Sequence, residues 1–560
     1  MLAIFWTFLY AHYTFELAMF SRFISRMIAY GLLLLAFLGW WLTRRQVRLR
    51  DRFLAIGVVI VASLVAGLLA DPTVDGFVLF MTAFPFVFTA WTLWVLASRN
   101  RSLRLQRIGF CAVIVAITGF FALLRWEGLY GNQIPQFSWR WSPTAEELFL
   151  ASRNDQSGAN ASVDRSAGAL QEWSLQPGDW PEFRGPNRDG VVRNVNVDTD
   201  WNTNSPKLLW RQRVGPAWSS MIVVDGFLVT QEQRGEFEAV VCYEAATGRE
   251  LWVHVDEERF YEGLSGAGPR GTPTFANGRI YALGGKGRLV CLAAKDGKPL
   301  WSRDAVSEAD GAVPQWGYSV SPLVVDNKVI VFAGGKGQQG LLAFDAQSGA
   351  PVWSQSGGTM SYSSPQRLTI RGREQVVMHD NQALRSVSVD DGTALWQHTI
   401  ASETAMPMLQ PQLVADGRLL LATDPGMALL EIQRDGENWK VDEKWSSNRL
   451  KPSFNDFVVH YGYIYGLDDG ILTCVDLADG RRVWKKGRYG HGQLLLLTDQ
   501  DLLLVLSETG EVVLVSANPD QHQELGRFKA IEGKTWNHPV VARGRLFVRN
   551  AEEMAAYGLQ

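Results

Sequence analysis

One short pattern recurs between residues 242 and 484 and restricts what the chain can fold into. An apolar strand is followed by a polar residue and Gly, and Trp comes four residues after the Gly. Five copies align without gaps: CYEAATGRELW (242–252), CLAAKDGKPLW (291–301), AFDAQSGAPVW (343–353), SVSVDDGTALW (386–396) and CVDLADGRRVW (474–484). A polar residue and Gly suit a tight hairpin, because Gly accepts positive φ. The Trp on the returning strand can then fill the space between neighbouring sheets.

A second element, a strand, a turn and another strand, accompanies the hairpins and occurs eight times. Its copies cover residues 219–232, 272–285, 321–335, 364–380, 410–424, 455–469, 492–508 and 537–550. Joined to a hairpin, each copy predicts a four-stranded unit. The aromatic positions recur about every 40 to 50 residues, which is the period of propeller blades. They are Trp210, Trp252, Trp301, Trp353, Trp396, Trp445, Trp484 and Phe528.

The last unit has no outer strand of its own, because the chain ends in NAEEMAAYGLQ. The segment PKLLWRQRV (206–214) lies ahead of the first unit and can supply that strand, which closes the ring. The copy around Trp439 and Trp445 is degenerate. We therefore predict an all-β eight-bladed propeller over residues 179–560.

Four long apolar runs precede the propeller, at residues 23–42, 53–70, 77–97 and 108–124. Each is close to the roughly 20 residues that a transmembrane helix needs. The loops TRRQVRLRDR (43–52) and SRNRSLRLQR (98–107) are rich in Arg, so the positive-inside rule makes them cytoplasmic. Residues 1–130 are predicted to be a helical membrane domain, with the propeller on the extracytoplasmic side.

Residues 1–20 could form a fifth span or an interfacial N-terminus. His12 and Glu16 lie four residues apart on one helical face, where a buried proton or quinone site is the alternative to an interfacial location. Residues 131–178 are predicted to be a linker. Within it, Thr144 and Glu147 form a capping box for a short helix over 142–151, and the polar stretch 152–171 is expected to be a flexible tether.

The net charge of −3 gives no sign of a nucleic-acid partner. Cys242, Cys291 and Cys474 occupy the same repeat position, which indicates separate buried thiols. The eight His form no HxxxH or HxH pair, so we predict no metal cluster.

The repeat resembles the pyrroloquinoline-quinone (PQQ)-type propeller repeat of bacterial proteins. The segment DWPEFRGPNRDGV (179–191) resembles the sequence that precedes many such propellers. Residues 454–484 and 534–559 are similar to members with an N-terminal multi-span membrane domain. Arg184 and Arg188 in this segment could bind an anion or fasten a structural turn. The resemblance implies the fold but leaves the activity open, because the same repeat builds quinoprotein dehydrogenases and non-enzymatic scaffolds of the outer-membrane-assembly type.

Residues just before each innermost strand should form a ring at one mouth of the central channel. This ring is aromatic, with a few hydrogen-bonding groups. It could bind a flat ligand, a peptide or a sugar, or it could simply close the channel by packing. Its members are Trp218, Arg270, Trp316, Tyr318, Tyr362, Gln410, Asn455, Asp456, His491, Trp536, Asn537 and His538.

We consider two alternative functions for this ring. The first is a non-catalytic scaffold in the bacterial inner membrane that presents its mouth and blade edges to a protein or polymer partner. The second is a PQQ-dependent dehydrogenase that oxidises an alcohol or sugar and reduces membrane quinone. There Asn455 and Asp456 would be Ca²⁺ ligands and Arg270 the cation beside the quinone. The vicinal Cys pair of alcohol-oxidising quinoproteins is absent, although membrane-bound glucose dehydrogenases, which resemble this layout, lack it too.

Overall fold

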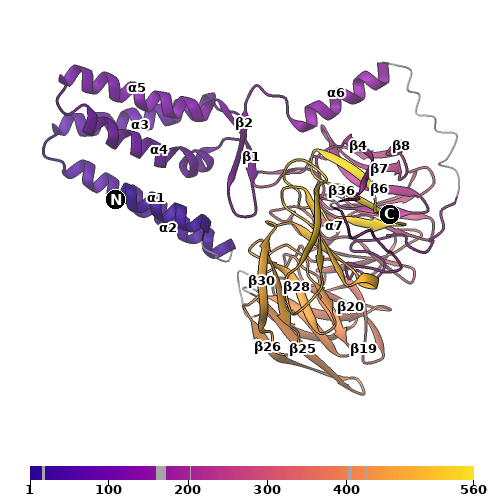
Figure 1. Ribbon diagram of the computed structural model, residues 1–560. Coiled ribbons are helices and arrows are strands. Elements are labelled where there is room, and N and C mark those ends of the chain that lie inside the picture. Colours follow the sequence, from indigo (N-terminus) through magenta and orange to yellow (C-terminus); the bar gives the residue numbers. More distant parts are fainter. Residues whose placement is uncertain (15–18, 159–171, 202, 401–405, 424–425, 560) are drawn as a thin grey trace. The chain divides into compact units, whose positions relative to one another are not determined.

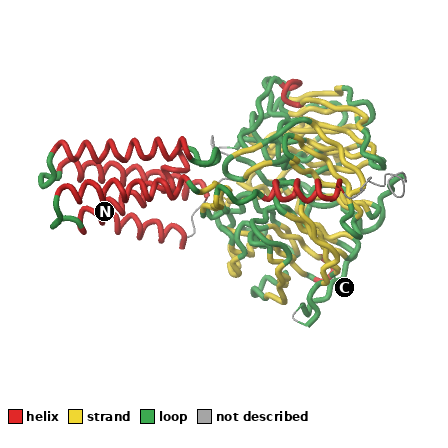
Figure 2. The backbone as a smooth tube through the Cα atoms, turned by 90° about the horizontal axis from the view of Figure 1, so that it is seen from above, coloured by secondary structure: helices red, strands yellow, loops and turns green. Residues whose placement is uncertain are grey.

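The computed structural model describes residues 1–14, 19–158, 172–201, 203–400, 406–423 and 426–559. The chain divides into two compact units. Unit 1 contains Met1–Pro143 and Gly263–Gly266, and unit 2 contains Thr144–Glu262 and Ala267–Gln560. Unit 1 is a helix bundle with one small hairpin, and unit 2 is built from β-sheets (Figures 1 and 2).

Unit 1 contains five helices among the described residues, and four of them coincide with the four apolar runs predicted to be spans. The five helices are α1 (Leu2–Thr14), α2 (Met19–Thr43), α3 (Leu49–Leu69), α4 (Gly76–Ala97) and α5 (Leu103–Ala122). The last four are long and apolar enough to cross a membrane, whereas the apolar part of α1, Leu2–His12, is shorter. The His12 ring lies 2.7 Å from Ser25 Oγ on α2, and Glu16 lies outside the described residues.

A two-stranded hairpin follows α5, which the sequence analysis did not predict. Its strands β1 (Leu124–Leu129) and β2 (Pro135–Trp139) pair antiparallel. Arg26 at the start of α2 donates to the backbone oxygen of Gln133 in the hairpin turn, at 3.2 Å. The beginning of α2 and the end of α5 therefore lie at the same end of the bundle.

Unit 2 is the predicted eight-bladed propeller. Blades 1 to 4 are each four antiparallel strands in chain order. These strands are β5 (Met221–Val224), β6 (Phe227–Arg234), β7 (Phe237–Glu244) and β8 (Glu250–Asp256); β11 (Thr274–Ala276), β12 (Arg279–Leu283), β13 (Arg288–Ala293) and β14 (Pro299–Asp304); β15 (Leu323–Val325), β16 (Lys328–Phe332), β17 (Leu341–Asp345) and β18 (Pro351–Gln355); and β19 (Gln366–Ile370), β20 (Arg373–His379), β21 (Ala383–Ser388) and β22 (Ala394–Thr399).

Blades 5 to 8 continue the ring. Their strands are β23 (Gln412–Ala415), β24 (Arg418–Thr423), β25 (Gly426–Asp435) and β26 (Asn438–Ser447); β27 (Val458–His460), β28 (Tyr463–Asp468), β29 (Ile471–Asp476) and β30 (Arg482–Arg488); β31 (Gln493–Leu497), β32 (Leu502–Leu506), β33 (Glu511–Ser516) and β34 (Glu524–Lys529); and β35 (Val540–Ala542), β36 (Arg545–Arg549) and β37 (Glu553–Gly558). Blade 8 takes its outer strand from β4 (Lys207–Arg213), with Trp210 opposite Ala556. The predicted closure of the ring is confirmed.

The recurring Trp residues join each blade to the next. In six of them the indole Nε1 donates to a backbone carbonyl of the following blade at 3.0–3.2 Å. The ring also lies flat against the repeat Gly of that blade. A Cβ placed on Gly297 would lie 2.4 Å from the Trp252 ring, and one on Gly392 would lie 2.6 Å from the Trp353 ring. The repeat Gly is thus required by its positive φ and by the neighbouring indole.

The junction between blades 4 and 5 is built differently. Trp396 donates to Gln375 Oε1 of its own blade at 2.7 Å, and Arg371 donates from blade 4 to the carbonyl of Ile432 at 3.0 Å. Strands β25 and β26 are ten residues each, longer than the outer strands elsewhere. An elongated hairpin and an Arg contact therefore replace the Trp–Gly contact, which explains the degenerate repeat around Trp445.

The predicted short helix is α6 (Ala145–Gly158), and its capping box is present. Thr144 N donates to Glu147 Oε2 at 2.7 Å, and Glu147 N donates to Thr144 Oγ1 at 3.0 Å. The helix runs through residues 152–158, which we expected to be part of a flexible tether. That expectation is wrong for these seven residues, because α6 is fastened to the propeller; residues 159–171 lie outside the described part.

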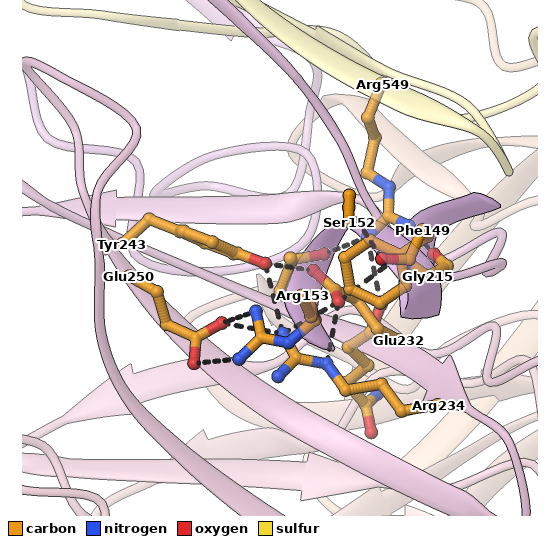
Figure 3. Close-up of polar contacts among 11 residues, drawn as sticks. Phe149, Ser152, Arg153, Gly215, Glu232, Arg234, Tyr243, Glu250 and Arg549 are labelled. Atoms are coloured by element: carbon orange, nitrogen blue, oxygen red, sulfur yellow. Dashed lines mark hydrogen bonds and ion pairs between the residues drawn. The ribbon is translucent and has the colours of Figure 1, made fainter. Parts of the chain in front are cut away.

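Charged side chains fasten α6 to blade 1 (Figure 3). Arg153 binds both carboxylate oxygens of Glu250 at 2.6 and 2.8 Å, and Glu146 binds Arg259 through two bonds of 2.8 and 2.9 Å. Between these two pairs, Phe149 is buried under the guanidinium of Arg234, 5.4 Å from the ring centroid. The first turn of the helix and its middle are therefore both fastened to the propeller.

Behind α6 lies a buried polar network in the same view. Arg234 donates to Glu232 at 3.0 Å and to Glu250 at 2.9 Å, and Tyr243 donates to Glu232 at 2.5 Å. Arg549 of blade 8 is fully buried beside them and donates to the carbonyl oxygens of Gln231 and Gly215. The network connects the last blade to the first, so α6 covers the seam where the ring closes.

We predict that Gly297→Ala destabilises the protein far more than Gly372→Ala. Both glycines have positive φ, at 69° and 72°, but Gly372 has no atom within 4 Å of an added Cβ. The control should lose about 1 kcal/mol of unfolding free energy from backbone strain alone, and Gly297→Ala about 2 kcal/mol more from overpacking. Chemical denaturation measures both. If the Trp252 indole is the cause, the additional loss of unfolding free energy in Gly297→Ala disappears in a Trp252→Ala background. An additional loss that persists in that background would contradict this explanation.

We predict that Arg153→Met lowers the unfolding free energy by about 1–3 kcal/mol, because Glu250 loses a bidentate partner in a partly buried site. Arg193→Met is the matched control, since Arg193 forms an exposed pair with Asp189. Thermal unfolding followed by tryptophan fluorescence compares them. Equal effects of the two substitutions would show that α6 does not contribute to the seam.

Candidate functional site

The segment that leads into the propeller, residues 179–192, crosses the central channel and is called here the lead-in segment. Trp180 exchanges backbone hydrogen bonds with Val223 of blade 1, and Phe275 N of blade 2 donates to the carbonyl of Pro181 at 2.8 Å. At its other end, β3 (Val191–Val192) pairs in parallel with β31, the inner strand of blade 7. The segment therefore contacts inner strands on several sides of the ring.

Two fully buried Arg side chains extend these contacts. Arg188 donates to the carbonyl oxygens of Pro322 and Pro365, which precede the inner strands of blades 3 and 4, at 2.5 and 2.9 Å. Arg184 donates to the carbonyl oxygen of Phe457, next to the inner strand of blade 6, at 2.8 Å. Arg188 donates through both Nη atoms and Arg184 through Nη2, so both side chains fasten the lead-in segment to several blades.

Arg184 also reaches Asp456, one of the predicted mouth residues. Its Nη1 lies 3.3 Å from Asp456 Oδ1, and His538 Nε2 lies 2.8 Å from Asp456 Oδ2. Burial alone would raise the pKa of the Asp456 carboxyl, but Arg184 and His538 hold it below its usual value. Asp456 and His538, from blades 6 and 8, are therefore brought together by the lead-in segment.

Asn455 and His491 form a second buried pair. Asn455 Nδ2 donates to the carbonyl oxygen of Gly492 at 2.6 Å, and its Oδ1 lies 3.1 Å from His491 Nδ1. Phe454 stacks on the His491 ring, with centroids 5.5 Å apart. The Asn455–His491 pair therefore lies at the junction of blades 6 and 7.

Aromatic residues from blades 8 and 1 meet at the mouth. The rings of Trp218 and Trp536 are 4.9 Å apart, and Lys534 Nζ lies 5.4 and 4.6 Å from their centroids. Trp536 donates to Glu508 Oε1 at 2.8 Å. Both Trp residues are half-buried, so they present aromatic surface at the mouth. Lys534 and Glu508 were not anticipated, because no repeat position marks them.

A second aromatic pair comes from blades 3 and 4. The Trp316 and Tyr362 rings are 5.1 Å apart, and Trp316 N donates to the Tyr362 hydroxyl at 3.3 Å. Tyr318 lies instead in the core between blades, where its hydroxyl donates to the carbonyl of Ala333 at 2.8 Å. Asn537 and Gln410 are also buried and donate to backbone carbonyls.

Arg270 forms a separate charged group near blade 2. It pairs with Glu262 at 3.1 Å and lies 4.6 Å from the Phe260 centroid. Nearby, the buried Glu238 accepts hydrogen bonds from Gly285 N at 3.0 and 3.2 Å, and burial raises the pKa of its carboxyl to about 7. The sequence alone could not predict this pKa for Glu238, because Gly284 and Gly285, which pack against its carboxyl group, belong to another blade.

The residues assigned to a Ca²⁺ and quinone site do not fit that group. A Ca²⁺ ligand needs free carboxylate or amide oxygens, yet Asp456 is ion-paired with Arg184 and His538, and Asn455 is bonded to His491. Arg270 precedes the inner strand of blade 2 and is itself paired with Glu262. Among the residues that the structure describes, no group of three or more His, Cys, Asp or Glu is placed to hold a metal ion.

Residues 236–486 match the PQQ_2 family model, described as outer membrane protein assembly factor BamB. The second unit therefore resembles PQQ-like propellers over this part of its length. Over 378 residues it is 23% identical to the outer membrane protein assembly factor BamB of Yersinia pestis, a match that covers 62% of this chain and 87% of that protein.

Quinone-dependent dehydrogenases also match the PQQ-like propeller. The dehydrogenase subunit of alcohol dehydrogenase (quinone) from Gluconacetobacter polyoxogenes is 28% identical over 212 residues, which is 34% of this chain and 28% of that subunit. The crystal structure of the quinohemoprotein alcohol dehydrogenase from Comamonas testosteroni superposes with a TM-score of 0.50 at 14% identity, covering 72% of this chain and 84% of that one. This likeness shows the fold alone.

We predict that Asp456→Asn costs about 3–5 kcal/mol of unfolding free energy at neutral pH, because Arg184 is left as an uncompensated buried charge. The pKa of Asp456 is depressed in the folded protein, so its ion pair stabilises the fold above about pH 4 and loses that contribution as the pH falls through the folded pKa. The difference in unfolding free energy between the wild type and Asp456→Asn should therefore decrease at acidic pH.

Denaturant titrations between pH 3 and 7 measure this difference, with Asp520→Asn, an exposed carboxylate, as control. A constant difference over the whole pH range would contradict the ion pair as its origin.

Proposed function

We propose that this protein is a bacterial inner-membrane scaffold whose extracytoplasmic propeller binds a protein or polymer partner. The observation that carries the proposal is that Asp456 forms ion pairs with Arg184 and His538. The acidic group best placed for a metal-dependent cofactor instead fastens the lead-in segment. What remains at the mouth is aromatic surface with compensated charges, which suits binding by stacking and shape.

The location rests on the helices and their loops. Helices α2 to α5 carry Arg-rich connections at residues 43–52 and 98–107, which favours a cytoplasmic position for these loops. The chain after α5 would then emerge on the opposite side. The match to an outer membrane protein assembly factor agrees with an extracytoplasmic propeller.

The blade edges offer a second surface for a partner. The outer strands of blades 8, 1, 2 and 3 expose apolar side chains: Leu208, Val253, Val255, Leu300 and Val352. The outer strands of blades 5 and 7 are rich in Lys, Arg and Glu, which discourages strand pairing. An extended segment of a partner would accordingly add to the apolar edges.

The alternative is a PQQ-dependent dehydrogenase, favoured by the segment shared with quinone-dependent alcohol dehydrogenases. Titration of the full-length protein in nanodiscs with PQQ and Ca²⁺ separates the two functions. We expect no saturable change in quinone absorbance, no rise in melting temperature and no dye reduction with alcohols or sugars. Saturable binding with turnover would overturn the scaffold proposal.

The scaffold proposal also predicts a partner at the mouth. A photo-crosslinking residue in place of Trp218 should give a discrete crosslinked product in cells, and Trp536→Ala should weaken it several-fold. The same crosslinker in place of Leu175, an exposed position away from the mouth, is the control. Identical products from both positions would contradict binding at the mouth.

A further inference from the structure

The β1–β2 hairpin of unit 1 packs on the end of the helix bundle. Trp126 on β1 is buried in a cluster with Val74, Val78 and Phe121, and its backbone N donates to Thr73 Oγ1 at 3.0 Å. These partners lie at the end of α5, in the loop after α3 and at the start of α4. The hairpin therefore covers the end of the bundle at which α3 and α5 finish.

Arg140, directly after β2, holds the chain to the ends of two spans. Its Nη1 donates to the carbonyl oxygens of Leu69, the last residue of α3, and of Ala122, the last residue of α5. A cation near helix C-termini is favoured by the partial negative charge there and by the unpaired carbonyls. Residue 140 is thereby fixed at the level where these spans end.

The two neighbours of Arg140 are exposed tryptophans. Trp139 and Trp141 stack with centroids 5.0 Å apart and an interplanar angle of 9°, yet they are 43% and 64% exposed. The edge of Trp139 also meets Phe120 of α5, at 6.0 Å. An aromatic pair left this open in water would lose much of the benefit of burying apolar area.

The exposed pair is continuous with the outer surface of the spans. Large apolar side chains at the ends of α3 and α5 are exposed as well: Leu68, Leu69, Phe120 and Leu123. If α2 to α5 cross a bilayer, this surface faces lipid up to the level of Arg140. Trp prefers the headgroup layer, because its ring is apolar and its indole N–H can still bond to water or lipid.

We propose that Trp139 and Trp141 bind the lipid headgroup layer, and that the β1–β2 hairpin is an interfacial anchor that sets the depth of the bundle in the membrane. The occupant of the aromatic surface is the bilayer that surrounds the spans, since the surface continues theirs. The proposal rests on α2 to α5 being membrane-spanning.

Spin labelling of the full-length protein in phospholipid nanodiscs tests the proposal. With Cys111→Ala as background, the remaining Cys242, Cys291 and Cys474 are fully buried and should not react in the folded protein. A nitroxide is placed by Trp141→Cys, and its collision rates with oxygen and with a water-soluble nickel chelate are compared. Val61→Cys, on the exposed side of α3, and Leu175→Cys, in unit 2, are the references.

We expect the oxygen-to-nickel ratio at position 141 to lie between those at 61 and 175. A ratio at 141 equal to that at 175 would place the pair in water and overturn the proposal. Low collision rates with both reagents at 141 would indicate cover by protein and would also overturn it. A water-like ratio at 61 would instead overturn the membrane-spanning premise, so the two failures are distinguishable.

A second measurement tests whether the indoles set the depth. A nitroxide at Ile134→Cys in the hairpin turn reports the depth while Trp139 and Trp141 are both replaced. Replacement by Tyr should leave the ratio unchanged, whereas replacement by Ala should shift it toward water. Equal ratios in both variants would show that the aromatic pair does not anchor the hairpin.

Discussion

The propeller depends on the contact between a Trp ring of one blade and the backbone of the next. The indole donates a hydrogen bond across the gap, and its flat face takes the space where a Cβ would otherwise stand. Hydrogen bonding and close packing are satisfied together, so the contact fixes how neighbouring sheets pack. Six of the junctions between blades carry this hydrogen bond, and β4 supplies the outer strand that the last blade lacks.

The closed ring has a central channel. The lead-in segment places Arg184 and Arg188 in this channel, where each can donate to several acceptors. Each Arg guanidinium carries five donors in a fixed plane, and the beginnings of the inner strands expose carbonyl oxygens around the axis. Arg188 and Arg184 bind these carbonyls from several blades at once. The cost is the burial of positive charge, which Asp456 and Glu182 offset.

Charge also decides how the chain enters the propeller. Sequence composition marks residues 152–171 as polar and without apolar period, yet α6 extends to Gly158 and is held by Arg153 and Glu146. Its partners Glu250 and Arg259 lie about a hundred residues further along the chain, beyond any local pattern. A polar composition therefore predicted solvent exposure here, whereas complementary charges on blade 1 produced a docked helix.

The sequence by itself determined the elements whose cause is local. The Gly–Trp spacing and the eight copies of the strand–turn–strand element predicted the number and order of the blades. The 206–214 segment predicted the closure, and hydropathy located the four candidate spans. Each of these predictions rests on a periodicity or on the backbone preference of single residues. Only the tertiary structure decided which mouth residues meet. Trp218 with Trp536, and Asp456 with His538, come from different blades, while Tyr318 and Asn537 turned out to be buried in or beside the core. Those outcomes depend on side-chain directions around a closed ring and on a lead-in segment that crosses it, and neither is encoded in the spacing of residues along one strand.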